Sequence, residues 1–104
     1  VDHEAELAVV VGKRAKDVPV EAVDSVIFGY TAANDVSARD IQKRDVQWAR
    51  AKGFDTACPL GPWIVTPGEL AEAGLDIEDL RVRGGVNGVT KQNESTALMI
   101  NSVL

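Results

Sequence analysis

One short run decides the fold: Glu6-Leu7-Ala8-Val9-Val10-Val11, followed directly by Gly12. Valine is β-branched and favours extended backbone, and six residues is the length of a strand rather than of a helix. The glycine and the basic pair after it, Lys13-Arg14, are typical of a turn. We therefore expect a buried strand over residues 6–11 that ends at this turn.

Two further elements are expected before residue 36. Pro19 and the acidic residues after it are typical of a helix start, and Val20, Val23 and Val26 then share one face, which predicts a short amphipathic helix. The aromatic and β-branched residues 27–33 follow, and they end at Asn34-Asp35, a pair that favours turns and strand ends. Residues 27–33 are therefore predicted to form a second strand.

The next segment is rich in long side chains. Residues 37–51 contain neither proline nor glycine, and Ser37 could cap a helix, so at least the first half should be helical. Several prolines then surround the apolar run 63–65, which predicts a loop that leads into a short strand. A brief helical turn is expected within residues 68–80.

The last part of the chain predicts a β-hairpin. Residues 80–83 and 89–92 alternate in character with period two, and Asn87-Gly88 between them is a favoured hairpin turn. Strands outnumber helices and do not alternate strictly with long helices. The predicted fold class is therefore α+β and β-rich.

Length and composition limit the possible functions. The 104 residues suffice for one domain, with 45% hydrophobic and 26% charged residues, as in a globular protein. A net charge of −5 argues against binding to nucleic acid or to an anionic membrane, and no apolar run has the roughly 18–20 residues of a membrane span. The single cysteine permits no internal disulfide, so we expect a cytoplasmic protein.

Two glutamates at the start of the first strand are candidate metal ligands. Glu4 and Glu6 stand two residues apart, so the strand pleat directs both carboxylates to one face. Mg²⁺ and similar hard cations take oxygen ligands, and Asp35 at the end of the second strand would be a third. A solvated strand edge is the commoner explanation of such a glutamate pair, and spacing alone does not decide between the two.

Three more polar residues are candidate substrate ligands. Arg39 and Gln42 stand three apart on one predicted helical face and could hold a carboxylate, for which the arginine fork is suited. Lys52 would add a point charge for the same anion or for an enolate that forms during reaction. Each of the three is also explained as an ordinary surface residue.

Several strings together resemble the fumarylacetoacetate hydrolase family. They occur in the same order and spacing as in that family, almost from the first residue to the last. They are residues 1–10 (VDHEAELAVV), 28–31 (FGYT), 34–40 (NDVSARD), 47–55 (QWARAKGFD), 58–63 (CPLGPW), 86–88 (VNG) and 95–100 (STALMI).

This resemblance implies a fold and a site. Residues 1–104 would be part of one catalytic domain, a β-rich mixed sheet roll of the C-terminal-domain type. Mg²⁺ or Mn²⁺ would be the cofactor, and the substrate would be a small 2-oxo acid. The implied metal ligands are Glu4, Glu6 and Asp35; the implied substrate-binding residues are Arg39, Gln42 and Lys52, of which Lys52 would also be catalytic.

The resemblance also implies a class of reaction. A divalent-metal-dependent hydrolase or lyase would cleave C–C bonds of acylpyruvate-like or fumarylacetoacetate-like acids through a metal-bound enolate. One alternative is an isomerase or decarboxylase acting on 2-hydroxyhepta-2,4-diene-1,7-dioate or oxaloacetate. We also expect a homodimer, with a role in the catabolism of aromatic compounds or in 2-oxo acid metabolism.

The sequence departs from the family pattern in two places. Hydrolytic members use a His-Glu pair from a lid that precedes the E-x-E strand, and a later T-G-T-P-x-G-V-G segment closes their substrate site; neither occurs among these 104 residues. The chain is therefore expected to be a central portion of the domain. A non-catalytic metal-binding fragment is a third alternative. His3 is expected to face away from the glutamates in a structural or solvent-exposed role.

Four other residues are expected to pack in the interior. Cys58 has no base near it in sequence, so a buried structural thiol is the preferred interpretation over a nucleophile. Trp48 and Trp63 are expected to pack against the sheet and Met99 to fill the core.

Overall fold

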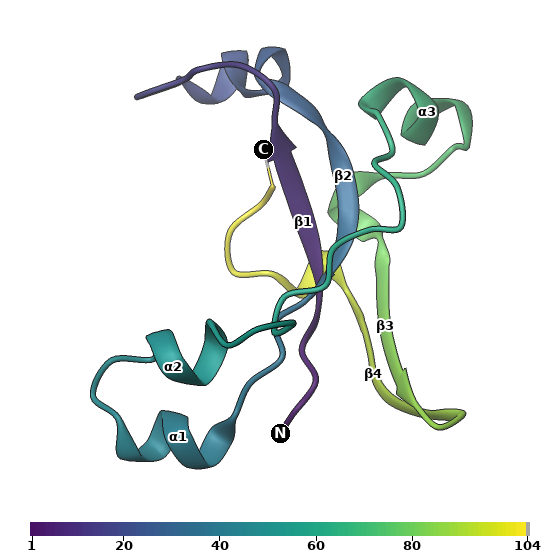
Figure 1. The fold of residues 1–104 in the computed structure, drawn as a ribbon. Helices are drawn as coiled ribbons and strands as arrows, with labels where there is room; N and C mark the ends of the chain where they lie inside the picture. Colours follow the sequence, from purple (N-terminus) through teal and green to yellow (C-terminus); the bar gives the residue numbers. More distant parts are fainter. Residues whose placement is uncertain (104) are drawn as a thin grey trace.

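The computed structural model describes residues 1–103, and Leu104 lies outside the described residues. Two antiparallel two-stranded sheets form its framework (Figure 1). The first pairs β1 (Ala5–Val11) with β2 (Ile27–Asn34), and the second pairs β3 (Arg81–Val86) with β4 (Val89–Ser95). The two predicted strands, the predicted hairpin and the α+β fold class are confirmed.

The β1–β2 ribbon is only half covered. Exposed and partly buried residues alternate along most of β1, so the expectation of a buried strand is wrong. A two-stranded ribbon has two faces, and in this chain one of them packs against other elements. Ala5 is paired with Asn34 and Glu6 with Ala33, so the start of β1 lies beside the end of β2.

The free edge of β2 is covered by an irregular segment rather than by a full strand. Residues 63–65 were expected to form a short strand, but Val65 makes a single bridge to Tyr30, with both backbone hydrogen bonds at 2.8 Å. Pro62, which has no N–H to donate, interrupts the pairing. Gly29 permits this close approach, because a Cβ atom there would lie 2.5 Å from the Val65 carbonyl oxygen.

The predicted helices are present but shorter than expected. Residues 20–25 form a 3₁₀-helix rather than an α-helix. The segment 37–51 is divided into α1 (Arg39–Arg44) and α2 (Ala49–Lys52), which lie side by side at the end of the ribbon where β1 begins (Figure 1). The predicted helical turn after residue 68 corresponds to α3 (Pro67–Glu72), which begins with a capping box. The structure also has 3₁₀-helices at Ile77–Asp79 and Thr96–Leu98.

Ser37 does not cap a helix. The residue at the start of α1 is Ala38, and no side chain caps that helix. Ser37 is instead completely buried, and its hydroxyl contacts charged side chains that are described below.

The apolar core is small and lies beside β2. Tyr30, Leu70 and Ile77 are its buried members, and Leu7 and Leu80 are among the partly buried residues packed on them. It joins the middle of the ribbon to α3 and to the 3₁₀-helix Ile77–Asp79.

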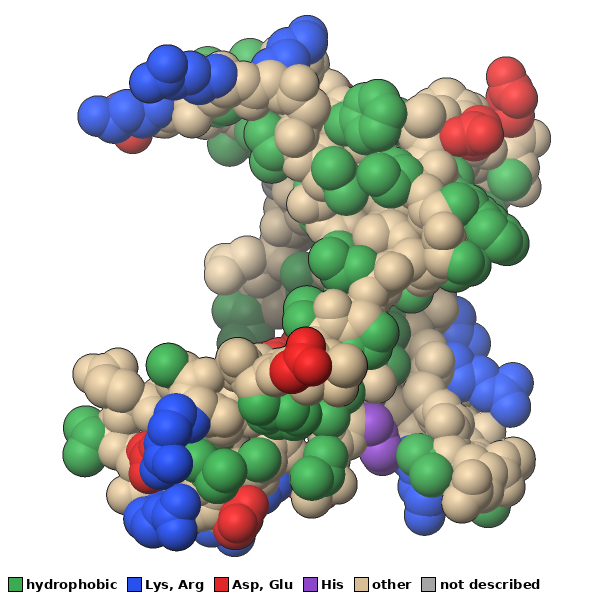
Figure 2. Space-filling view, in the orientation of Figure 1, with side chains coloured by type: hydrophobic (Ala, Val, Ile, Leu, Met, Phe, Trp, Pro, Cys, Tyr) green, Lys and Arg blue, Asp and Glu red, His purple; other side chains and the backbone are tan. Residues whose placement is uncertain are grey.

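Many large apolar side chains lie outside this core. Cys58 is exposed, Trp63 is 71% exposed, and Trp48 and Met99 are more than half exposed, so the expectation that these four residues are interior is wrong. Figure 2 shows hydrophobic side chains across the middle of the face that it views. Two small sheets and three short helices do not provide enough surface to cover them. Within residues 1–103, no helix has the length and apolar character needed to cross a membrane.

Candidate metal centre

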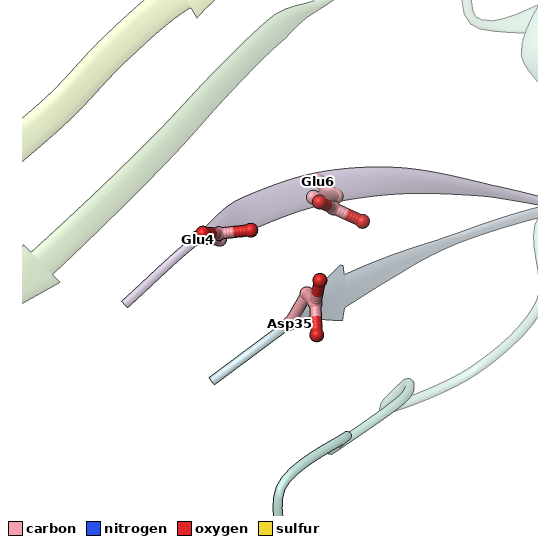
Figure 3. Close-up of side chains that lie close together, drawn as sticks. All are labelled: Glu4, Glu6 and Asp35. Atoms are coloured by element: carbon pink, nitrogen blue, oxygen red, sulfur yellow. The ribbon is translucent and has the colours of Figure 1, made fainter. Parts of the chain in front are cut away.

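Three carboxylates meet where β1 begins and β2 ends. Glu4 stands just before β1 and Glu6 within it, while Asp35 directly follows β2. A hydrogen bond of 3.0 Å from the Asp35 N–H to the Glu4 carbonyl oxygen holds the two strand ends together. Each side chain offers an oxygen to one cluster whose members lie within 4.8 Å of one another (Figure 3).

The donor set suits a hard divalent cation. Around an octahedral Mg²⁺ with a Mg–O distance of about 2.1 Å, neighbouring ligand oxygens are about 3.0 Å apart and opposite ones about 4.2 Å, so the three carboxylates would move closer together to share one ion. The cluster combines all-oxygen donors with three negative charges. These residues could therefore hold Mg²⁺ or a similar cation.

The two glutamates experience opposite electrostatic environments. The pKa of Glu6 is raised above its usual value, first because burial removes water from the carboxylate and then because Asp35 and Glu4 lie near. The pKa of Glu4 is lowered, chiefly by a hydrogen bond from Lys52 and also by one from Arg39, against the opposing effect of burial. Glu4 is thus compensated by hydrogen bonds from two cations, whereas the attraction of Lys52 for Glu6 is outweighed by burial and by the two neighbouring carboxylates, so a metal would stabilise the Glu6 charge.

Lys52 lies directly against the cluster. Its Nζ donates to Glu4 Oε2 at 3.0 Å, to Ser37 Oγ at 2.8 Å and to an Asp35 carboxylate oxygen. The hydrogen bond to Asp35 is the main reason that the pKa of Lys52 is raised. The short helix α2 therefore places a permanent positive charge beside the three acids.

Arg39 and Gln42 lie together on α1. Arg39 donates to Gln42 Oε1 at 2.7 Å and to Asp2 at 2.9 Å, and it also forms an ion pair with Glu4. The hydrogen bonds to Asp2 and Glu4 raise the pKa of Arg39. Arg39 and Lys52 thus contact the carboxylates, and Gln42 is linked to them through Arg39.

Two hydrogen-bonding residues of this region were not singled out as site residues from the sequence. Ser37 Oγ lies 3.2 Å from Glu4 Oε1 and accepts the hydrogen bond from Lys52, so it connects an acid to a cation. Asn34 Oδ1 accepts a 2.8 Å hydrogen bond from the Glu4 N–H. Both residues lie in the NDVSAR string close to Asp35, and this position is the sequence feature that could have identified them.

His3 takes no part in these hydrogen bonds. Its Nδ1 atom is buried and has no hydrogen-bond partner among residues 1–103.

Comparison with known proteins identifies the family. The whole chain, residues 1–104, matches the family described as Fumarylacetoacetate (FAA) hydrolase C-terminal. The chain belongs to the fumarylacetoacetate hydrolase family. The resemblance noted in the sequence strings is thereby confirmed.

Relatives within the fumarylacetoacetate hydrolase family have different enzyme names. The 2,4-didehydro-3-deoxy-L-rhamnonate hydrolase of a Sphingomonas species is 44% identical over 103 residues, which cover 98% of this chain and 35% of the relative. The oxaloacetate tautomerase of Bacillus subtilis is 42% identical over 103 residues, which cover 99% of this chain and 33% of the relative.

A solved structure of the family has the same fold. The 2-hydroxyhepta-2,4-diene-1,7-dioate isomerase from Mycobacterium marinum is 53% identical and superimposes with a TM-score of 0.86, over 97% of this chain and 38% of that protein. The chain spans between 31% and 44% of the length of the curated relatives that it matches.

Proposed function

We propose that the protein is a divalent-metal-dependent enzyme that acts on small 2-oxo acids. Glu4, Glu6 and Asp35 would hold the metal, with Mg²⁺ or Mn²⁺ as the ion. The observation that carries this proposal is the set of three carboxylates, with oxygens within 4.8 Å of one another, contacted directly by two cationic side chains. Such a site gathers both charge types that a metal-chelating anionic substrate requires.

The ion and the side chains would have separate tasks. When bound, Mg²⁺ or Mn²⁺ supplies Lewis acidity toward the oxygens of a 2-oxo acid. Lys52 is the catalytic residue in this proposal, because its ammonium lies at the carboxylate cluster and can stabilise the negative charge of an enolate. Arg39, whose guanidinium is oriented by Gln42, would bind the substrate carboxylate.

The names of the relatives support the enolate as the shared chemistry. Oxaloacetate is a 2-oxo acid, and 2-hydroxyhepta-2,4-diene-1,7-dioate is the enol form of one. A hydrolase of the family acts on a didehydro sugar acid. Cleavage of a C–C bond next to a carbonyl, tautomerisation and isomerisation all leave negative charge on the same 2-oxo group. One arrangement of metal and lysine therefore serves all three.

Hydrolysis or lysis of a C–C bond in an acylpyruvate-like or fumarylacetoacetate-like acid is our first candidate reaction. Isomerisation, tautomerisation or decarboxylation of a dicarboxylic 2-oxo acid is the second, and the names of the Bacillus and M. marinum relatives favour it. We further propose that the protein is cytoplasmic and forms a homodimer. Light scattering of the purified protein would test the dimer, and cell fractionation would test the location.

A substrate panel tests the function. The purified protein would receive an acylpyruvate or oxaloacetate with Mg²⁺, Mn²⁺ or EDTA. We expect metal-dependent consumption of at least one substrate and loss of that activity in Lys52→Met. Lys43→Met is the matched control, because Lys43 is an exposed lysine in the last turn of α1. Metal binding without turnover of any substrate would support the non-catalytic alternative instead, and equal turnover in the two lysine variants would contradict the role of Lys52.

A further inference from the structure

The second sheet contacts the first at the residue between the two glutamates. Gln92 in β4 extends its side-chain amide to the backbone of Ala5. The Ala5 N–H donates to Gln92 Oε1 at 2.9 Å, and Gln92 Nε2 donates to the Ala5 carbonyl oxygen at 2.6 Å. One side chain thus satisfies both polar backbone groups of a residue 87 positions away in sequence.

A glycine allows this approach. Gly84 is the cross-strand partner of Gln92 in the β3–β4 hairpin. A Cβ atom at Gly84 would lie only 3.1 Å from the Cβ atom of Ala5 and 3.5 Å from that of Gln92. The hairpin therefore contacts Ala5 through the backbone of Gly84 on β3 and through the side-chain amide of Gln92 on β4. Figure 1 shows the hairpin beside the start of β1.

The position of these hydrogen bonds matters for the metal centre. The Ala5 N–H belongs to the peptide plane that it shares with the Glu4 carbonyl, and the Ala5 carbonyl belongs to the plane that it shares with the Glu6 N–H. Peptide planes are rigid, so the path from Glu4 to Glu6 has only a few soft dihedral angles. A pair of hydrogen bonds to both planes restrains their relative orientation and therefore the positions of the Glu4 and Glu6 Cα atoms that the planes contain.

We propose that Gln92 is a positioning residue of the metal centre, which holds Glu4 and Glu6 in the relative orientation that one cation requires. This inference rests on the proposed function, since it takes the two glutamates as ligands. The Gln92 side chain bonds to the Ala5 backbone and acts on the two glutamates through it. Loss of such a partner of the ligands typically weakens metal binding about 10- to 100-fold.

The test is the Mn²⁺ affinity of Gln92→Met, measured by isothermal titration calorimetry. Methionine has a similar length, but it cannot donate to the Ala5 carbonyl, and its thioether sulfur is only a weak acceptor for the Ala5 N–H. We expect Mn²⁺ binding at least about tenfold weaker than in the wild type, together with faster hydrogen exchange of the Ala5 amide. The matched control is Asn93→Leu, which removes the neighbouring amide of β4; Asn93 bonds the exposed Arg81 and should leave Mn²⁺ binding within twofold.

The outcomes separate this inference from the proposed function. If the wild type takes up no Mn²⁺, the proposed function fails and this inference fails with it. If the wild type binds Mn²⁺ and folded Gln92→Met binds equally well, Gln92 only attaches the hairpin, and this inference alone is overturned. If Gln92→Met does not fold, Gln92→Glu replaces it in the test. Glutamate retains an acceptor for the Ala5 N–H but has no donor for the Ala5 carbonyl. A Mn²⁺ affinity of Gln92→Glu equal to that of the wild type would overturn the inference.

Discussion

The middle of the β1–β2 ribbon and the end where β1 begins are held together in different ways. Near its middle, Tyr30 packs with Leu70 and Ile77 in a small apolar core. At the end where β1 begins, the chain is held by directed polar contacts, among them the hydrogen bond from Asp35 N–H to Glu4 and the amide pairing between Gln92 and Ala5.

This difference predicts how substitutions in each of the two regions affect the protein. Apolar packing is non-directional and contributes roughly in proportion to the area that is buried. Hydrogen bonds fix orientation, but their net contribution to stability is about 1 kcal/mol each. Changes in the core should therefore alter stability without altering the metal centre, whereas changes in the polar contacts should alter metal affinity more than stability.

The largest expected effect on stability is in the core. Ile77 is 6% exposed, and Ile77→Ala should lower the free energy of unfolding by about 2–5 kcal/mol through lost burial and a residual cavity. Urea denaturation measures this change. Val20→Ala is the control, because Val20 is exposed and its truncation should leave the free energy of unfolding nearly unchanged. Mn²⁺ affinity of the folded fraction should stay unchanged. A strong loss of Mn²⁺ affinity would mean that packing in the core also determines the geometry of the metal centre.

A smaller loss of stability, with a clear effect on the site, is expected for Ser37→Ala. The buried hydroxyl links Glu4 to Lys52, and its removal takes away hydrogen bonds to these two charged groups, a loss of about 1.5–3 kcal/mol. Mn²⁺ affinity should fall about tenfold, as for other partners of ligands. Ser25→Ala is the control: it removes an exposed hydroxyl that donates to the Ala22 carbonyl, and it should change neither the stability nor the Mn²⁺ affinity. Unchanged affinity in Ser37→Ala would show that its role is packing alone.

The smallest effects are expected from Glu4→Gln and Glu6→Gln. In metal-free protein at pH 7, these two substitutions should change thermal stability in opposite directions. The lowered pKa of Glu4 means that its ionised form stabilises the fold at neutral pH, and this stabilisation is lost as the pH falls through the lowered value. The raised pKa of Glu6 means that its ionised form destabilises the fold once the pH rises through the raised value.

Glu4→Gln should therefore lower the melting temperature and Glu6→Gln should raise it. Thermal unfolding in EDTA, followed by circular dichroism from pH 3 to pH 8, measures both. The destabilisation by Glu4→Gln should shrink as the pH falls through the lowered pKa of Glu4, and the stabilisation by Glu6→Gln should shrink as the pH falls through the raised pKa of Glu6. Shifts of the same sign at pH 7 would contradict the electrostatic difference between the two glutamates.

Local patterns in the sequence predicted the strands well. The valine run of β1 and the Asn87-Gly88 turn of the hairpin depend on neighbouring residues, and both are present in the structure. The division of residues 37–51 into α1 and α2 was not predicted, because no proline or glycine marks the break. The exposure of Trp63 depends on how much surface the other elements can cover, which no local pattern contains.

The candidate site was predictable to the extent that short-range geometry determines it. The strand pleat relates Glu4 to Glu6, and the turn-favouring Asn34-Asp35 pair places Asp35 at a strand end. The contribution of Gln92 was not predictable, since it depends on a contact between residues 87 positions apart. Ser37 was misinterpreted because serine before a helix is usually a cap, and here its hydroxyl points to Glu4 and Lys52 instead.

The most direct measurement of the central claim is a calorimetric titration of Mn²⁺ into the wild-type protein and into Asp35→Asn. Asparagine preserves the size of the side chain and removes one of the three negative charges. We expect one Mn²⁺ per chain in the wild type and a loss of affinity of at least about 100-fold in the variant, because a ligand and its charge are both removed, while circular dichroism shows an unchanged fold. Equal stoichiometry and affinity in the two proteins would contradict the assignment of Glu4, Glu6 and Asp35 as a metal centre.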